Sequence, residues 1–260
     1  HTGFKGTWLT KWLLNLGAEV IGVSNKIPTN PSMFEILGLK EKIKHIEEDI
    51  RNFNELSKII SKEKPEFIFH LAAQAIVSAS YINPLETISS NVMGTTNLLE
   101  ALRISNHHCT AIIITSDKAY DNVEQIWGYK ENDKIGGKDI YSGSKGAAEL
   151  VIKSYFHSFF KLEHSNVRLA VARAGNVIGG GDWAKDRIIV DAISAWIKEE
   201  KVEIRSPKAT RPWQHVLEPL SGYLNLGMKL HKEKFLNGEG FNFGPLSIED
   251  KTVKELLTDL

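Results

Sequence analysis

Two residues spaced one helical turn apart have side chains suited to acid-base chemistry. Tyr141 and Lys145 are separated by three residues, and residues four apart on a helix share a face. Tyrosine is a poor base at neutral pH because its ordinary pKa is about 10, but a nearby ammonium group favours the phenolate. Such a phenolate can take the proton of a hydroxyl group while hydride leaves the same carbon. Many amphipathic helices carry this pair without any function, so the pattern needs context.

A second group of polar residues directly follows a predicted strand. Thr115, Ser116, Asp117 and Lys118 come after the apolar run 111–114, at the edge where open α/β sheets bind ligands. Ser116 offers a hydroxyl donor, Asp117 an acid and Lys118 an amine base. An amine acts as a base only when neutral, so this role requires a lowered pKa for Lys118. The alternative is an ordinary turn with a solvated lysine.

The chain opens with a small-residue turn typical of phosphate-binding loops. Gly3 and Gly6 have the spacing of the last two glycines in a G-x-x-G-x-x-G pattern. A backbone without Cβ can approach a pyrophosphate, whose charge is then held by amides at a helix N-terminus. An ordinary helix-opening turn is the alternative. The candidate cofactor-binding residues of this turn are Thr2, Gly3, Phe4, Lys5 and Gly6.

The next strand does not identify the dinucleotide. Val23 is followed by Ser24, Asn25 and Lys26, where an acid that binds the adenosine ribose would be expected for NAD. The residues at this point therefore do not confirm NAD, and they do not exclude NADP.

Apolar runs and amphipathic stretches alternate along the chain and must position these residues. This alternation predicts an α/β fold, a Rossmann-type doubly wound parallel sheet with a smaller C-terminal substrate-binding lobe. After Arg173 the sequence is richer in Gly, Pro and Trp, so we expect a dinucleotide-binding domain over 1–174 and a mainly substrate-binding lobe over 175–260. We predict strands at 20–23, 44–47, 67–71, 111–115 and 169–173, and helices after the opening turn, after an Asn52 cap, and at 84–105 and 141–160.

Both ends of the chain interrupt this pattern. A strand should precede the opening turn, yet the chain begins at His1. Ser247 and Asp250 are candidate caps of a last helix that has little room before Leu260. We therefore expect a chain cut at both ends that lacks the first strand of its sheet, retains its cofactor weakly and has low stability.

Composition excludes several classes of protein. The 260 residues are 42% hydrophobic and 25% charged, as in ordinary globular proteins. The 32 Lys and Arg balance the 32 Asp and Glu, which gives no reason to expect a nucleic acid or a membrane as partner. No apolar run approaches the ~18 residues of a membrane span. The single Cys109 fits the cytoplasm, and it lacks the partner cluster that a metal site beside His107 would need.

Taken together, these motifs resemble the extended short-chain dehydrogenase/reductase family over essentially the whole chain. The glycine turn, Asp49-Ile50, the run from His70 to Gln74, and then Ser116, Tyr141 and Lys145 occur in the family's order. Within the family, the segments most similar to its sugar-nucleotide 4,6-dehydratases are 2–6, 115–122, 173–183 and 211–216.

This resemblance implies a reaction without net redox change. CDP-glucose would become CDP-4-keto-6-deoxyglucose and water, on a route to deoxysugars of surface polysaccharides, with NAD as cofactor. Tyr141 and Lys145 would act at the sugar C4, and Ser116 would hold O4. Asp117 would be the acid of the elimination across C5 and C6. Lys118 would be its base, at a position where dTDP-glucose dehydratases carry Glu.

The resemblance also implies binding residues and an assembly. Arg187 and Arg211 are candidates for the substrate pyrophosphate because guanidinium groups match phosphate, and Asn176 is a candidate for the sugar diphosphate. A homo-oligomer, dimer or tetramer, is expected through the long helices. Simpler roles remain open: a helix cap for Asp49, a buried hydrogen-bonding residue for Asn91, and close packing for the alanines. Further implied cofactor contacts are Asp49, Ile50, Leu71, Ala72, Ala73, Gln74, Asn91, Thr115, Tyr141 and Lys145.

Other functions compete with this interpretation. A 4-epimerase would need no group to expel the 6-hydroxyl, so Asp117 and Lys118 would be idle. A dehydratase acting on a dTDP-, GDP- or UDP-sugar should carry a carboxylate where Lys118 stands. A non-catalytic nucleotide-binding module would need neither Tyr141 nor Lys145.

Overall fold

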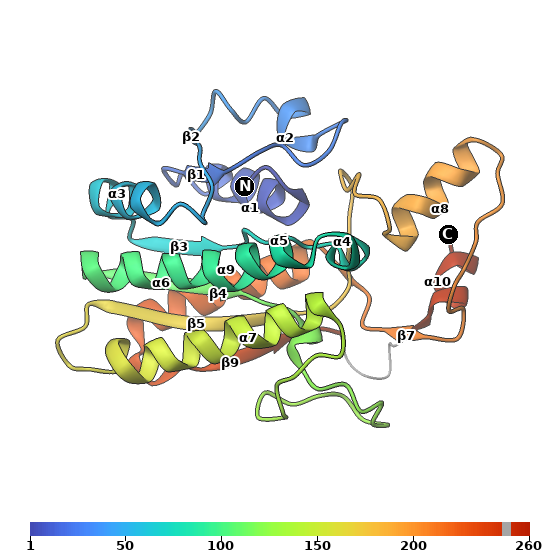
Figure 1. Ribbon diagram of the computed structural model, residues 1–260. Helices are drawn as coiled ribbons and strands as arrows, with labels where there is room; N and C mark the ends of the chain where they lie inside the picture. The colour runs from blue at the N-terminus through green and yellow to red at the C-terminus, as the bar shows by residue number, and fades with distance from the viewer. Residues whose placement is uncertain (246–250) are drawn as a thin grey trace.

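Helices and parallel strands alternate along the protein (Figure 1). The computed structural model describes residues 1–245 and 251–260. The predicted α/β class with a Rossmann-type arrangement is confirmed. Within these two ranges no helix combines the length and the apolar composition that a membrane crossing requires.

A four-stranded parallel sheet lies at the centre. Strand β4 (Cys109–Ile114) is buried along its whole length, because helices cover both faces. It pairs with β3 (Phe67–His70) on one side and with β5 (Val167–Ala174) on the other. Strand β9 (Gly240–Phe243) then extends the sheet beyond β5. Residues that follow β4 and β5 therefore emerge side by side at one edge.

A second parallel pair lies nearer the N-terminus. Strand β1 (Ile21–Ser24) pairs with β2 (Lys44–Glu47), and residue 21 lies opposite residue 44. Among the described residues no strand hydrogen-bonds β1 to β3, so the β1–β2 pair is separate from the four-stranded sheet.

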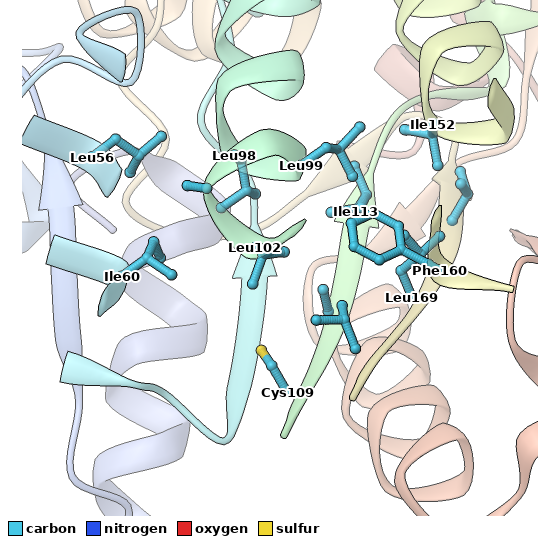
Figure 2. Close-up of a cluster of buried hydrophobic side chains, with 14 residues drawn as sticks. Leu56, Ile60, Leu98, Leu99, Leu102, Cys109, Ile113, Ile152, Phe160 and Leu169 are labelled. Carbon is cyan, nitrogen blue, oxygen red and sulfur yellow. The ribbon is translucent and has the colours of Figure 1, made fainter. Parts of the chain in front are cut away.

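The two faces of the central sheet build two separate cores. Because side chains alternate along a strand, Ala111 and Ile113 of β4 enter one core, while Ile112 and Ile114 enter the other. Figure 2 shows the first core, where Ile113 packs among leucines. The helices are α3 (Phe53–Glu63), α6 (Gly94–Ser105) and α7 (Ile140–Tyr155) on the first face, and α1 (Phe4–Asn15) and α9 (Leu217–Lys232) on the second.

The two long predicted helices are confirmed, and each contains a π-helical turn. Helix α5 (Pro84–Ile88) continues through a π turn (Ser89–Met93) into α6, and α7 continues into a π turn (Phe156–Phe160). π turns are frequent at functional sites, and the first of these carries the predicted cofactor residue Asn91. Gly94 begins α6 where the Ile50 side chain packs against the backbone, a place that a Cβ would fill.

All five predicted strands occur, and the strand at 44–47 has the predicted bounds. The Asn52 cap is also confirmed, since its side chain accepts the backbone N–H of Glu55 at 3.5 Å. Strand β9 was not predicted, because it is short and begins with glycine; pairing with β5 stabilises it. Also unpredicted are the two-residue strands β6 (Val177–Ile178), β7 (Thr210–Arg211), β8 (Gln214–His215) and β10 (Lys251–Thr252).

The last helix, α10 (Val253–Thr258), begins with a capping box. The Thr252 hydroxyl accepts the N–H of Glu255, whose carboxylate accepts the N–H of Thr252. The candidate caps Ser247 and Asp250 lie outside the described residues. The remaining helical segments are α2 (Met33–Ile36), α4 (Val77–Ile82), α8 (Ile188–Ile197) and the 3-10 turns Asp117–Ala119 and Lys234–Leu236.

The part of the chain after residue 174 contributes to two regions. Helix α9 and strand β9 return to the central sheet, whereas α8, α10 and β7 lie to one side of it (Figure 1). The division into domains 1–174 and 175–260 remains a prediction.

Candidate active site

The segment after β4 turns sharply and presents the first candidate group. Ser116 caps the 3-10 turn: its hydroxyl accepts the N–H of Lys118 at 3.2 Å and donates to Asp117 Oδ1 at 3.0 Å. Serine suits this position because its side chain satisfies a free amide at the start of a helical turn. The three residues are thus presented from one turn at the sheet edge.

Helix α7 presents the second group. Its cap is Asp139, which accepts both the N–H of Ser142 at 3.0 Å and the hydroxyl of Ser142 at 2.6 Å. The next residues place Tyr141 and Lys145 on one face, with Lys145 Nζ 6.0 Å from the centre of the Tyr141 ring. Ser116 hydrogen-bonds the Tyr141 side chain. The structure thus brings Ser116, Tyr141 and Lys145 together from two elements.

The expected lowering of the pKa of Tyr141 is not found. Burial raises the pKa of Tyr141 to about 12. The Ser116 hydrogen bond and Arg187 lower it, but Asp117 adds to the increase. Burial also lowers the pKa of Lys145 to about 8, assisted by Lys5. Desolvation therefore outweighs the neighbouring charge, a balance that residue spacing does not reveal.

Further cations lie beside this pair. Lys5, in the first turn of α1, has its pKa lowered to about 8 by burial and by Arg187, while Asp117 opposes the shift. The Arg187 guanidinium lies 5.9 Å from the centre of the Phe4 ring and donates to Asp182 Oδ2 at 2.6 Å. Arg187, a predicted phosphate-binding residue, thus lies near the catalytic candidates. A cluster of positive charge at this edge suits an anionic ligand.

The N-terminus of α1 fits a dinucleotide pyrophosphate. The helix cap is Gly3, no side chain caps the first turn, and this turn contains no acid. A Cβ on Gly3 would meet nothing within 4 Å, whereas a Cβ on Gly6 would lie 2.8 Å from the Cα of His1. The first-turn amides are therefore open to an anion, and Gly6 permits the tight turn. Thr2 fixes this turn through its hydroxyl, which bonds Ser24 at 2.7 Å.

Two predicted cofactor residues near β2 have partners within the protein. The Asp49 carboxylate accepts from Arg51 at 2.6 Å and from Asn25 at 3.0 Å. The hydrogen bond with Arg51 is the main reason why the pKa of Asp49 falls to about 2. Ile50 packs against the first core. The structure therefore gives both residues structural contacts within the protein, and Asp49 bonds the residue that follows β1.

Asn91 organises the loop after β3. Its amide Oδ1 accepts the N–H of Gln74 at 2.8 Å, and its Nδ2 donates to the Gln74 carbonyl at 3.0 Å and to Ser144 Oγ at 2.8 Å. The side chain of Gln74 accepts the N–H of Ile76 at 2.6 Å. Asn91 is thus a buried residue that forms hydrogen bonds within the protein, the structural role that the sequence analysis kept open beside a cofactor contact. It joins the loop that contains Ala72 and Ala73 to α7.

His70 is the last residue of β3 and Leu71 follows it, and the two side chains contact different parts of the protein. Leu71 packs against the second core. His70 is buried and lies 3.1 Å from the Thr95 hydroxyl, and burial followed by the charge of Lys145 lowers its pKa to about 3. His70 is therefore neutral at physiological pH.

The two other substrate candidates, Asn176 and Arg211, lie in segments that meet beside Asp117. A Cβ on Gly175 would collide with Pro212 and would lie 3.2 Å from Asp117 Oδ2. Asn176 follows Gly175, and its carbonyl accepts the N–H of Gln214 at 3.1 Å. Arg211 precedes Pro212, and its guanidinium donates to the Thr210 carbonyl at 2.7 Å. Asn176 and Arg211 are thus one residue away from the junction at Asp117.

Sequence reasoning missed a buried ion pair behind the site. Arg173 of β5 binds Glu149 of α7, and the Thr115 hydroxyl donates to Glu149 Oε1 at 2.6 Å. Thr115 therefore has a partner inside the protein. In the sequence, the four-residue spacing of Lys145 and Glu149 indicates only that Glu149 shares a helix face with Lys145.

A buried tyrosine was also missed. Tyr223 of α9 is fully buried, and its hydroxyl has no hydrogen-bond partner among the described residues. Lys5 Nζ lies 6.0 Å from the centre of its ring.

No three His, Cys, Asp or Glu side chains gather as metal ligands in the described part of the chain. His107 instead contacts Ser105 at 2.9 Å and the Pro65 carbonyl at 3.0 Å.

Comparisons with known proteins agree with this geometry. Residues 1–254 match the GDP-mannose 4,6 dehydratase family. A CDP-glucose 4,6-dehydratase from Salmonella typhimurium is 50% identical over 257 residues, which cover 98% of this chain and 72% of that protein. A CDP-paratose 2-epimerase from Salmonella typhi is 28% identical over 98% of this chain and 80% of its own length.

Solved structures share the fold at low identity. A dTDP-glucose 4,6-dehydratase from Streptomyces venezuelae with NAD bound superposes with a TM-score of 0.84 at 18% identity, over 99% of this chain and 77% of that chain. A UDP-glucose 4-epimerase from Thermotoga maritima gives 0.84 at 23% identity, over 99% and 78%. The fold, the order of the motifs and the match over nearly the whole chain place this protein in the GDP-mannose 4,6 dehydratase family, within the extended short-chain dehydrogenases/reductases.

Proposed function

We propose that this protein is an NAD-dependent sugar-nucleotide 4,6-dehydratase whose substrate is CDP-glucose. One observation carries the proposal: Ser116, Tyr141 and Lys145 converge beside Asp117 and Lys118. The 50% identical CDP-glucose 4,6-dehydratase supports the choice of substrate. The open first turn of α1 supports the cofactor, because its free amides suit a pyrophosphate.

The first chemical task is removal of the proton from the sugar 4-hydroxyl. Tyr141 takes this proton, and Ser116 donates a hydrogen bond to O4. The pKa of Tyr141, about 12, means that nearby positive charge must favour its phenolate. Arg187 lowers the pKa of Tyr141, and Lys145 lies over its ring. The open first turn of α1 would hold NAD through its pyrophosphate, and the bound cofactor would supply the hydride acceptor for C4 and the hydride donor for C6.

The second task is elimination of water across C5 and C6. The 4-ketone acidifies the C5 proton, which we assign Lys118 to remove through its amine nitrogen. Asp117 donates a proton to O6, which leaves as water, and transfer of the 4-hydroxyl proton from Tyr141 to Asp117 restores both groups. The Lys118 ammonium finally returns a proton to C5, so that CDP-glucose yields CDP-4-keto-6-deoxyglucose and water.

The substrate diphosphate is assigned to the cations of the same edge. Arg187 lies beside Phe4 at the helix N-terminus, and Arg211 and Asn176 lie in the two segments that meet at Asp117. Arginine suits this task because its planar fork binds phosphate with two hydrogen bonds. The remaining predicted cofactor residues act by shaping the loops around the dinucleotide. They are Asp49, Ile50, Leu71, Ala72, Ala73, Gln74, Asn91 and Thr115.

The proposal extends to assembly and compartment. Large apolar side chains are exposed on α4, α5 and the following π turn, among them Leu85 at 83%, Ile82 at 76% and Met93 at 50%. Apolar surface of this kind marks a protein interface, so we assign it to a homo-oligomer, a dimer or tetramer. The single, buried Cys109 suits a cytoplasmic enzyme. Light scattering on the purified protein measures the oligomer directly.

The test offers the protein four sugar nucleotides. It is incubated with NAD and CDP-glucose, dTDP-glucose, UDP-glucose or GDP-mannose, and products are followed by mass and by absorbance in alkali. Loss of one water from CDP-glucose alone is the expected result. An unchanged mass with an epimerised sugar would assign the protein to the epimerases. Cofactor binding without turnover of any sugar would leave a nucleotide-binding module.

A further inference from the structure

A buried ion pair lies directly behind the catalytic candidates. Arg173 Nε donates to Glu149 Oε1 at 2.8 Å and to Oε2 at 3.0 Å, and Arg173 Nη2 also binds Oε2. The two side chains are 8% and 5% exposed. Such a pair is costly to desolvate and contributes little net stability unless its hydrogen bonds are complete. Its presence at this position therefore calls for a reason beyond stability.

The pair joins the elements that carry the site. Glu149 Oε1 accepts the Thr115 hydroxyl at 2.6 Å, and Thr115 immediately precedes Ser116. Arg173 Nη1 donates to the Tyr120 hydroxyl at 2.6 Å. The carboxylate thus links α7, which carries Tyr141, to the end of β4 and to the turn that follows it.

The same carboxylate lies one helical turn after Lys145. The groups that face Lys145 are Lys5 of α1, His70 of β3, and Tyr141 and Glu149 of α7. His70 and Tyr141 are neutral at physiological pH, because burial lowers the pKa of one and raises that of the other. Lys5 repels a second positive charge. Among these groups, Glu149 supplies the negative charge that favours the Lys145 ammonium.

We propose that Glu149 is a positioning residue of this active site. Held by Arg173 and Thr115, its carboxylate fixes α7 against the strand end that carries Ser116 and keeps Lys145 in its ammonium form. The proposal rests on the function proposed above only in assigning the Tyr141 and Lys145 pair to the 4-hydroxyl proton.

The test measures the titration of Lys145 without substrate or cofactor. The chain is prepared with lysine labelled with carbon-13 at the ε position, and the Lys145 signal, identified by its loss in Lys145→Arg, is followed by NMR against pH. The wild-type midpoint is expected near 8. In Glu149→Gln it should fall by about one pH unit, which at pH 8 lowers the ammonium fraction from about one half to about one tenth.

Two variants separate charge from structure. Glu149→Asp keeps the charge but shortens the side chain, so the Lys145 midpoint should stay near the wild-type value even where thermal stability falls. Glu100→Gln removes the partner of Arg103 on the surface of α6 and should leave the Lys145 midpoint unchanged. A merely structural role for Glu149 would lower stability in both position-149 variants without moving the midpoint.

The folded Glu149→Gln protein with an unchanged Lys145 midpoint would overturn the proposal. Where this variant does not fold, Arg173→Gln keeps the Glu149 carboxylate but removes the positive charge paired with it, so the Lys145 midpoint should rise. An unchanged midpoint there would equally refute the role. The measurement needs no turnover, so its failure is distinct from failure of the dehydratase assignment.

Discussion

Lys145 Nζ lies 6.0 Å from the centre of the Tyr141 ring, one helical turn along α7. Both groups are buried, and burial disfavours the charged form of each. It raises the pKa of Tyr141 to about 12 and lowers the pKa of Lys145 to about 8. At neutral pH Tyr141 is therefore an uncharged phenol, whereas Lys145 is mostly an ammonium ion. Among the surrounding charges, Asp117 raises the pKa of Tyr141 and Arg187 lowers it, while Lys5 and Glu149 act on Lys145.

Replacement of Tyr141 by Phe should abolish dehydration while leaving the fold intact. Loss of a general base lowers turnover by about 10²–10⁴-fold. The ring remains, so the unfolding free energy should change by about 1 kcal/mol or less. Water loss from CDP-glucose and thermal unfolding are measured together. Tyr155→Phe, on the same helix, removes a hydroxyl that donates to Glu100 and should retain activity; equal losses in both variants would contradict the role of Tyr141.

Replacement of Lys118 by Met should block elimination. Because the amine removes the C5 proton in the proposed cycle, water loss should fall by about 10²–10⁴-fold. Solvent deuterium should also fail to enter C5 of the sugar, as read by mass spectrometry. Lys138→Met, an exposed lysine ahead of α7, is the matched control. Wild-type deuterium incorporation in the Lys118 variant would show that another group is the base.

Replacement of Lys145 by Met should stabilise the protein in a pH-dependent way. The pKa of Lys145 is about 8 in the folded protein and 10.5 as its ordinary value, so between these pH values the unfolded chain binds more protons. The cost of burying the ammonium, about 3 kcal/mol at most, is complete below pH 8 and disappears as pH rises toward the ordinary value.

Urea unfolding at a series of pH values checks this expectation. The gain of the variant over the wild type should be largest near neutral pH and should shrink as the solution becomes alkaline. Lys153→Met, at an exposed position of the same helix, should show no such trend. A gain that is independent of pH would mean that packing of the methionine, not the charge, is responsible.

Replacement of Gly175 by Ala should disturb the site through contact alone. The new Cβ would collide with Pro212 and lie 3.2 Å from Asp117 Oδ2. Overpacking of this kind costs about 1–3 kcal/mol, and displacement of Asp117 should lower turnover. Gly128→Ala, whose Cβ would meet nothing within 4 Å, is the control. Normal turnover and stability of the Gly175 variant would mean that the two loops separate freely.

Local sequence patterns predict the regular elements and the residues of the catalytic pattern. Strand β2 has its predicted bounds, Asn52 caps α3, and the Tyr141 and Lys145 spacing places both side chains on one helix face. These features depend on residues within one or two helical turns, where periodicity and capping preferences are readable. Their joint order also indicated the family to which the chain belongs.

The electrostatics of the site and the contacts that support it depend instead on segments that are distant along the chain. Glu149 and Arg173 are 24 residues apart, and neither local pattern shows that they meet. The lowered pKa that the sequence predicts for Tyr141 is wrong. Burial raises this pKa, and desolvation depends on all the groups packed around the hydroxyl. Strand β9 forms through pairing with β5, and a four-residue segment that begins with glycine carries little signal of its own. Contacts between distant segments, which spacing along the chain does not encode, therefore set the chemistry of this edge.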